Sequence, residues 1–396
     1  MLFWIQVQTN FLTRTHKIAI MNWNENELAF FTLLRAGLWN QESKHFPFPN
    51  AAFPRVFLLA EEQSVVGLIA AGIEWFSVQD LNFKIPKEDA LQFIGRTVQL
   101  EKTNQAMNQF IVTLAGRMQE AGIYALLVKG QGIAQCYSKP LWRSCGDVDL
   151  LLDKTNYTKA INFLAPMAQS IDEEDPLRLH YGMTIGRWVV ELHGTLRSGL
   201  SSRIDNEIDA IQHKTFEENH VRIWSHRNQT VYLPSPDNDI IFVFSHILQH
   251  FFKGGIGLRQ ICDLCRLLWT FRSDININLL EQRLRKMRLI SEWRTFAALA
   301  VDYLGMPAEA MPLYAQDRKW SKKGYKVLSL IIETGNFGHN RDMSYIKKNT
   351  YVYRKTKSFA YLLKDSTRRI TIFPIDSIRV LVKKLLFGVN MIIKGK

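Results

Sequence analysis

Three short apolar segments, separated by a glycine turn and a helical stretch, most constrain how this chain folds. They are residues 123–130, 147–153 and 186–196, and all three fall within a span of about 75 residues. Continuous apolar runs of this length, bounded by glycine and polar residues, are typical of buried strands. Their order predicts a small unit of strand, helix, strand, helix and strand.

Apolar side chains at helical spacing occupy the sequence on both sides of this unit. The longest such stretch is 90–122, where Gly122 is placed to end the helix as its C-terminal cap. Beyond about residue 235 the pattern becomes helical again, with a break at Gly254 and Gly255. We therefore predict an α+β fold, with a small mixed sheet between N- and C-terminal helical regions. Further helices are expected at 25–37, 52–75 and 279–304.

The order of these patterns divides the chain into five regions. Residues 1–20 are expected to be an upstream extension, because Met21 opens a helical segment that Asn24 or Asn26 can cap. The other expected regions are an N-terminal helical region at 21–100, the mixed-sheet core at 101–215, a second helical region at 216–316 and a basic region at 317–396.

Composition argues against two classes of protein. Hydrophobic residues make up 47% of the chain and charged residues 22%, yet no uninterrupted apolar run reaches the roughly 18 residues of a membrane-spanning helix. We therefore predict no transmembrane segment. The 4 cysteines are too few for a disulfide scaffold and fit a reducing cytosol, so a cytoplasmic location is expected.

Positive charge is concentrated in the last fifth of the chain. The stretch 317–396 holds 19 Lys and Arg against 5 Asp and Glu, a net of +14, whereas the whole chain carries +13. This excess indicates an anionic partner, either nucleic acid or a membrane surface. A solvated surface that merely keeps the protein soluble is the alternative.

The end of this basic region repeats apolar residues on one helical face, with Arg379, Lys383 and Lys384 lying off that face. The pattern predicts an interfacial amphipathic helix, peripheral to the inner membrane. Docking of the helix on the protein's own core is the alternative. The residues that share the apolar face are Ile378, Leu381, Val382, Leu385, Val389 and Ile392.

Two acids, Asp147 and Asp149, stand at the start of the second apolar strand. Side chains at i and i+2 of a strand point to the same face, so both carboxylates aim at one point. Like charges this close disfavour each other's ionised form unless a cation lies between them. Paired oxygen donors suit Mg²⁺ (or Mn²⁺) carrying substrate phosphates. Glu191, in the third strand, is a candidate third ligand, because acids between apolar residues are seldom there for packing.

A glycine turn joins the first strand to a short helix. Backbone N–H groups on such a turn make an anion cradle, and Lys129 adds a positive charge. Arg143 lies four residues before Asp147 and could reach a phosphate. The set predicts binding of a metal-bound nucleoside triphosphate. The candidate nucleotide-binding residues are Lys129, Gly130, Gln131, Gly132 and Arg143.

Together these residues resemble the nucleotidyltransferase superfamily, whose core carries a glycine turn, an Asp-x-Asp pair and a third acid. More narrowly, 122–152 resembles an uncharacterised bacterial nucleotidyltransferase-like group with an Arg-x-x-Gly-Asp-x-Asp-Leu-Leu signature. The turn departs from the wider superfamily, which usually has Gly-Ser or Gly-Gly where this chain has Lys-Gly followed by Gln131 and Gly132. The matching residues are Lys129, Gly130, Arg143, Gly146, Asp147, Asp149, Leu150 and Leu151, followed by Glu191 and His193 of a Glu-x-His.

The resemblance implies a DNA polymerase beta-like core that moves a nucleoside monophosphate from a nucleoside triphosphate to an acceptor. Asp147 and Asp149 would hold the metal ions, and Glu191 would help hold the catalytic one or act as a base. The alternative is a protein that keeps the fold with little or no turnover. Such a protein would recruit nucleic acid or an anionic membrane through its basic region.

Two further pairs of polar residues stand four apart on predicted helices. His246 and His250 have zinc-ligand spacing, but "HILQH" lacks the glutamate of a metalloprotease helix. Arg259 and Asp263 fit an intrahelical ion pair. In the resembling group a helical region of this kind carries similar polar residues, so these four, with His193, are candidates for the acceptor site. Hydrogen-bonded packing is the alternative.

Overall fold

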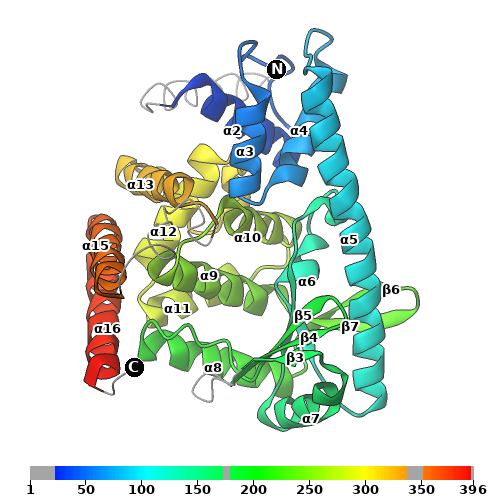
Figure 1. Cartoon of the computed structure of the whole chain (residues 1–396), viewed down its shortest axis with the longest axis vertical. Coiled ribbons are helices and arrows are strands. Elements are labelled where there is room, and N and C mark those ends of the chain that lie inside the picture. Colours follow the sequence, from blue (N-terminus) through cyan, green and yellow to red (C-terminus); the bar gives the residue numbers. More distant parts are fainter. Residues whose placement is uncertain (1–22, 173–178, 337–350, 394–396) are drawn as a thin grey trace.

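The computed structural model of the chain describes residues 23–172, 179–336 and 351–393. It contains a seven-stranded mixed sheet with helices on both faces (Figure 1). This arrangement confirms the predicted α+β fold. The expected upstream extension, 1–20, lies outside the described residues.

The strand order β3-β4-β5-β2-β1-β7-β6 places the three predicted strands, β1, β2 and β5, next to one another. β2 runs antiparallel to β1 and parallel to β5. β1 also pairs in parallel with β7. The strands are β1 (Leu126–Val128), β2 (Asp147–Leu151), β3 (Ser170–Ile171), β4 (His180–Ile185), β5 (Trp188–His193), β6 (Val221–His226) and β7 (Gln229–Pro234).

Alternation along β2 and β5 divides the sheet into an apolar and a polar face. Val148 and Val190 are buried on the apolar face, which packs against α5 (Lys87–Glu120) and α7 (Lys154–Leu164). Burial of each such side chain stabilises the fold by roughly 1.5–3 kcal/mol, and a one-residue slip would lose it. The acids of both strands therefore face the other way, toward α9 (Pro236–Lys253) (Figure 1).

Three helices form one end of the molecule: α2 (Glu25–Trp39), α3 (Phe53–Glu62) and α4 (Val66–Gln79) (Figure 1). Asn24 caps α2, since its side chain accepts hydrogen bonds from the first turn. The single helix expected at 52–75 is instead the pair α3 and α4. The chain turns between them at Ser64, whose φ of +57° is incompatible with a continuous helix.

α2 and α4 approach each other closely through glycines. A Cβ added at Gly72 would overlap the carbonyl oxygen of Leu33, and one added at Gly37 would overlap that of Leu68. We expect Gly72→Ala to lower the free energy of unfolding by about 1–3 kcal/mol, the usual cost of overpacking a core. Urea unfolding monitored by circular dichroism gives the value.

Gly95 on α5 provides the matched control. A Cβ at this position meets nothing within 4 Å. Alanine is favoured over glycine in a helix interior by about 1 kcal/mol, so Gly95→Ala should stabilise the protein. Equal effects of the two substitutions would contradict the close-packing argument.

Helices that follow β5 cover the polar face of the sheet. α9 and α10 (Leu258–Thr270) are the two helices predicted around the glycine break. Together with the N-terminal helices they enclose the larger of two hydrophobic cores. The smaller core lies between the sheet, α5 and α7. The other helices that follow β5 in this part of the chain are α8 (Ser202–Glu217), α11 (Ile277–Met287), α12 (Ile290–Ala298) and α13 (Arg318–Thr334).

The region 216–316, expected to be helical, begins instead with a β-hairpin. β6 and β7 pair antiparallel at one edge of the sheet. Arg227 and Asn228 form the turn with φ values of 47° and 61°. Positive φ at both central residues gives a tight hairpin whose twist matches its strands. The alternating sequence "VRIWSHRNQTVYLP" carries this signal, so the sheet extends beyond the expected boundary at 215.

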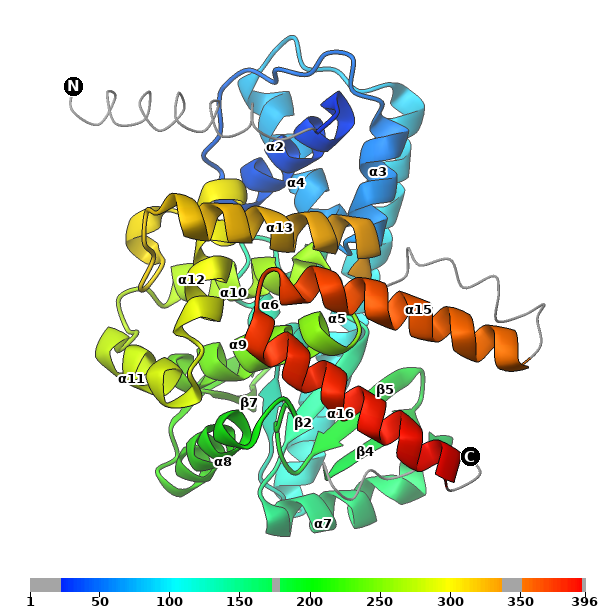
Figure 2. The same ribbon diagram turned by 90° about the vertical axis from the view of Figure 1, so that its left-hand side faces the viewer.

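Two helices, α15 (Tyr351–Ile370) and α16 (Pro374–Ile393), lie across the outer face of the molecule (Figure 2). α16 corresponds to the predicted amphipathic helix. Its Ile378 and Val382 are 49% and 47% exposed, so this part of the apolar face does not dock on the core. The side chains of Val389 and Ile392 lie outside the described residues. Within the described ranges, no helix combines the length and apolarity needed to span a membrane.

Candidate active site

Three carboxylates converge on the polar face of the sheet. Asp147 and Asp149 project from β2, and Glu191 of β5 lies opposite Asp149 in the parallel pairing. One oxygen from each carboxylate lies within 4.8 Å of the other two. The structure thus brings the three predicted acids together, at a separation that a divalent cation can bridge.

The negative charge of this cluster is least balanced at Asp147. Burial, followed by the charges of Asp149 and Glu191, raises the pKa of Asp147. Among the described residues, none donates a hydrogen bond to its carboxylate or forms an ion pair with it. A cation bound here would remove the repulsion, and three carboxylates are the hard oxygen donors that Mg²⁺ prefers.

Lys129 reaches the cluster from the end of β1. Its Nζ lies 2.9 Å from Oδ1 of Asp149. Burial alone would lower the pKa of Lys129, but Asp149, Glu191 and Asp147 raise it above its ordinary value. The backbone of Lys129 has φ of +58°, which is rare for a residue other than glycine and turns the chain sharply into α6 (Gly130–Ala134). Such strained backbone is common at functional sites.

Two histidines complete the polar network. The Nε2 atom of His193 lies 2.7 Å from Oδ1 of Asp149 and 3.4 Å from Oε2 of Glu191. The Nε2 atom of His180, on β4, lies 3.1 Å from the same Glu191 oxygen. Hydrogen bonds from His180 and then His193 lower the pKa of Glu191, so this carboxylate stays charged.

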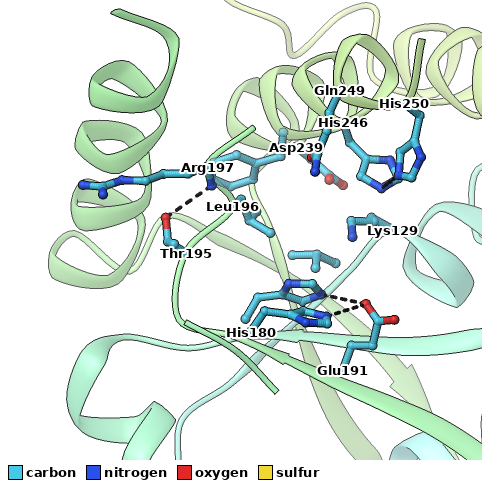
Figure 3. Close-up of a pocket in the computed structure, with 13 residues that line it drawn as sticks. Lys129, His180, Glu191, Thr195, Leu196, Arg197, Asp239, His246, Gln249 and His250 are labelled. Carbon is cyan, nitrogen blue, oxygen red and sulfur yellow. Dashed lines mark hydrogen bonds and ion pairs between the residues drawn. The ribbon is translucent and has the colours of Figure 1, made fainter. Parts of the chain in front are cut away.

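A cavity of about 180 Å³ opens beside Glu191, between the sheet and α9 (Figure 3). Lys129, Glu191 and the two histidines line the side that the sheet provides, and His246, Gln249 and His250 line the α9 side. Asp147 and Asp149 are not among the lining residues, so the cavity adjoins the carboxylate cluster from the side of Glu191. The other lining residues are Val128, Thr195, Leu196, Arg197, Asp239 and Phe242.

His246 and His250 form a close pair on α9, with 2.9 Å between their Nε2 atoms. Burial, and next the charge of Lys129, lowers the pKa of His250 to about 4 and that of His246 well below its ordinary value. Both imidazoles are therefore neutral near pH 7. Both side chains line the cavity on its α9 side.

The low pKa of His250 makes the stability of the protein depend on pH. Below pH 6.5 an unfolded His250 binds a proton that the folded protein excludes until about pH 4. The free energy of unfolding therefore falls as the pH falls through this window. In His250→Gln the fall should be shallower, as measured by urea unfolding at pH 7, 6 and 5. An unchanged pH slope, at an equal denaturant m value, would contradict the assignment.

Arg143 and Asp263 lie away from the cavity and bind each other. Nε and Nη2 of Arg143 lie 2.8 and 2.7 Å from the two carboxylate oxygens of Asp263. Tyr137 donates a further hydrogen bond to Asp263. Both partners are buried. The structure therefore does not bring Arg143 to the carboxylate cluster or Asp263 to the cavity, and their predicted contacts with phosphate and acceptor stay predictions.

Arg259 of α10 is a second arginine near the start of β2. Its Nη1 donates to the Ser144 carbonyl, three residues before Asp147. Its charge opposes the rise in the pKa of Asp147. Its Nε is buried and has no partner among the described residues. Arg259 is thus a cation with spare donor capacity, and it does not line the cavity.

The four residues of the glycine turn, 129–132, have different surroundings and therefore different roles. Gly130 has φ of +39°, so it allows the sharp turn into α6. Gln131 is buried and donates to Asn104 of α5, and Gly132 packs against Leu233. Gln131 and Gly132 therefore hold the turn against the body of the protein, and Lys129 alone of the four lines the cavity.

His180 and Asp239 are cavity residues that the sequence patterns did not single out. Ile185 pairs with Trp188 across the turn at Gly186, and the same register sets His180 opposite His193. The repeated apolar and polar alternation on both sides of Gly186 was the signal for this hairpin. For Asp239, which is buried and paired with Arg222, no local pattern distinguishes it from an ordinary first-turn acid.

A mixed sheet that carries an Asp-x-Asp pair, a third acid and a glycine turn defines a nucleotidyltransferase-like core. A family model described as uncharacterised nucleotidyltransferase matches residues 49–305, which include the whole sheet and the cavity. The match covers more than half of the chain, and the chain therefore belongs to this nucleotidyltransferase family. This confirms the resemblance drawn from the sequence. No curated protein and no solved structure matched the chain.

Proposed function

We propose that this protein is a magnesium-dependent enzyme that transfers a nucleoside monophosphate from a nucleoside triphosphate to an acceptor. One observation carries the proposal: the carboxylates of Asp147, Asp149 and Glu191 have oxygens within 4.8 Å of one another. The raised pKa of Asp147 adds support, because it marks a place where the protein itself supplies too little positive charge.

The proposed reaction joins an acceptor oxygen to the α-phosphorus and breaks the bond from that phosphorus to the departing pyrophosphate. Divalent metal chemistry supplies charge neutralisation and polarisation of the phosphoryl oxygens. The residues of the chain position the reactants. Asp147 and Asp149 would hold the metal ion, while Lys129 and Arg259 flank the cluster and offer cationic donors to phosphate oxygens.

The cavity beside Glu191 is the proposed acceptor site. Its volume of about 180 Å³ resembles that of a pocket that holds one small ring, so it admits a hydroxyl- or phosphate-bearing group and not a whole polymer. The lowered pKa of Glu191 suits a metal ligand better than a base. His246 and His250, held neutral, are the groups placed to contact the acceptor.

Calorimetric titration tests the proposal. ATP, GTP, CTP and UTP are titrated with and without Mg²⁺ into wild type and into Asp147→Asn/Asp149→Asn. We expect Mg²⁺-dependent binding of at least one nucleotide, lost in the double variant. Binding of none of the four would refute the proposed donor site. The nucleotide that binds then becomes the donor in a screen for the acceptor.

A second candidate function, recruitment to an anionic membrane, is favoured by the surface of α16. The apolar side chains of Ile375, Ile378, Val382 and Leu386 are 69%, 49%, 47% and 62% exposed and recur along one helical stripe. The region 317–396 carries a net charge of +14. An exposed apolar stripe within a basic region fits an anionic lipid surface better than nucleic acid, which offers no apolar layer to insert into.

Sedimentation with vesicles tests this second function. We expect the full chain to bind vesicles that contain phosphatidylglycerol and to stay unbound with neutral vesicles. Val382→Glu/Leu386→Glu should abolish binding without affecting nucleotide titration. If the double variant sediments as the wild type does, α16 is not the membrane contact. Binding to RNA in place of vesicles would instead favour the nucleic-acid alternative.

A further inference from the structure

Two histidines and a glutamate form a second group of potential metal ligands beside the carboxylate cluster. The Nε2 atoms of His180 and His193 lie 3.1 and 3.4 Å from the same oxygen, Oε2 of Glu191. One ligand atom from each of the three residues lies within 4.8 Å of the others. The three donors thus converge on one point, as the close-up of the cavity shows for His180 and Glu191 (Figure 3).

The β4–β5 hairpin fixes this arrangement through its register. His180 and His193 are direct cross-strand partners, and Glu191 shares a face with His193 because the two are separated by one residue. The cross-strand partner of Glu191 is Gly182, whose missing side chain leaves room on this face. The carboxylate of Asp172 enters that room, since a Cβ at Gly182 would overlap it. A further acid therefore stands beside the triad.

The spacing of the donors fits ligands around one ion. Bonds of about 2.1 Å at angles between octahedral and tetrahedral values place neighbouring ligand atoms roughly 3.0–3.4 Å apart. The two nitrogen–oxygen distances, 3.1 and 3.4 Å, agree with this range. The cavity of about 180 Å³ that all three residues line gives an ion and its water ligands a way in.

The chemistry of the donors distinguishes this group from the three carboxylates. Two imidazoles with one carboxylate suit first-row transition metals such as Mn²⁺, Fe²⁺, Co²⁺ or Zn²⁺. Mg²⁺ prefers oxygen ligands throughout. Lys129 is the nearby positive charge that would oppose a second cation, but its Nζ is engaged with Asp149 at 2.9 Å. Lys129 bonds to Asp149, which bonds to His193, and His180 bonds to Glu191. Negatively charged carboxylates therefore separate the Lys129 charge from the two imidazoles.

We propose that His180, Glu191 and His193 bind a first-row transition metal ion next to the magnesium site, with Glu191 shared between the two. The proposal rests on the proposed function in so far as Glu191 serves both sites. The transition metal would bind on the side of Glu191 that faces the cavity, and the metal-bound nucleotide would bind on the side that faces β2. The acceptor would then approach an ion held by nitrogen ligands.

Cobalt binding provides a direct test. The full chain, stripped with a chelator, is titrated with Co²⁺ alone and followed by visible absorption, with metal content checked by mass spectrometry. We expect one tightly bound Co²⁺ per chain with the spectrum of a nitrogen-ligated ion. His180→Ala should weaken binding by at least about 100-fold, because even indirect partners of metal ligands contribute 10–100-fold.

Two further variants separate this proposal from the proposed function. Asp147→Asn should leave Co²⁺ binding unchanged while it weakens Mg²⁺-dependent nucleotide binding. His213→Ala, which removes an exposed histidine paired with Glu217 on α8, is the matched control and should bind Co²⁺ as wild type does. Equal Co²⁺ affinity in His180→Ala and wild type would overturn the proposal. So would Co²⁺ binding that is lost in Asp147→Asn, since the ion would then lie in the carboxylate cluster.

Discussion

Asp147→Asn is expected to lower nucleotide transfer about a thousandfold while leaving the protein as stable as wild type or more so. A metal ion held by this carboxylate would contribute several kcal/mol to charge stabilisation, and each 1.4 kcal/mol is about a factor of ten in rate. Stability moves the other way, because the ionised Asp147 is repelled by Asp149 and Glu191, and the charges of Lys129 and Arg259 only partly offset this repulsion. Asparagine keeps the shape and removes that repulsion.

The two effects are measured separately. Pyrophosphate release, with water or an identified acceptor, reports transfer, and urea unfolding in the absence of metal reports stability. Glu281→Gln, which removes an exposed acid paired with Arg285 on α11, is the control and should change neither. If Asp147→Asn lowers the free energy of unfolding as much as an ordinary core substitution does, the Asp147 carboxylate stabilises the fold itself, and the argument that it lacks a cation is wrong.

Asp263→Ala is expected to destabilise the protein by about 3–5 kcal/mol, the usual cost of leaving one partner of a buried ion pair uncompensated. Asp263 accepts two hydrogen bonds from the Arg143 guanidinium and one from the Tyr137 hydroxyl. Removal of the carboxylate leaves these buried donors unsatisfied. The pair also joins the segment before β2 to α10, so its loss should loosen the start of the strand that carries Asp147.

A double substitution separates charge from packing. In Arg143→Met/Asp263→Leu both charges of the pair are removed, so we expect much of the lost stability to return. The exposed pair of Glu281 and Arg285 supplies the control, because removing it should cost no more than about 0.5 kcal/mol. Denaturant unfolding of the single and double variants gives the coupling. If the double variant is no more stable than Asp263→Ala, charge compensation is not the cause.

Local periodicity was sufficient to predict part of the candidate site. Asp147 and Asp149 share a face because a strand repeats every two residues, whatever its neighbours do. The caps at Asn24 and Asp153 were also predictable, since each side chain bonds to the backbone of its own first turn. The convergence of Glu191 on these acids depends on the pairing of β2 with β5, which the sequence supports only through the resemblance.

The rest of the site depends on contacts between segments far apart in the chain. Arg143 carries the positive charge expected of a residue that binds phosphate. Only the position of α10 in the fold shows that its guanidinium forms an ion pair with Asp263. His180 becomes a site residue through the register of a hairpin. Arg259 comes near Asp147 from a helix that lies more than a hundred residues further along the chain. Periodicity within a short segment carries no information about a contact at that separation.

β1 (Leu126–Val128) obtains its two neighbours at very different times during synthesis. β2 follows within about 20 residues, whereas β7 (Gln229–Pro234) emerges about 100 residues later, or roughly 5–20 s at ribosomal speed. Until then one side of β1 has unpaired N–H and C=O groups, which are a template for pairing with other chains. β1, which positions Lys129 beside the carboxylates, can therefore pair wrongly with other chains on the ribosome until the β6–β7 hairpin has been synthesised.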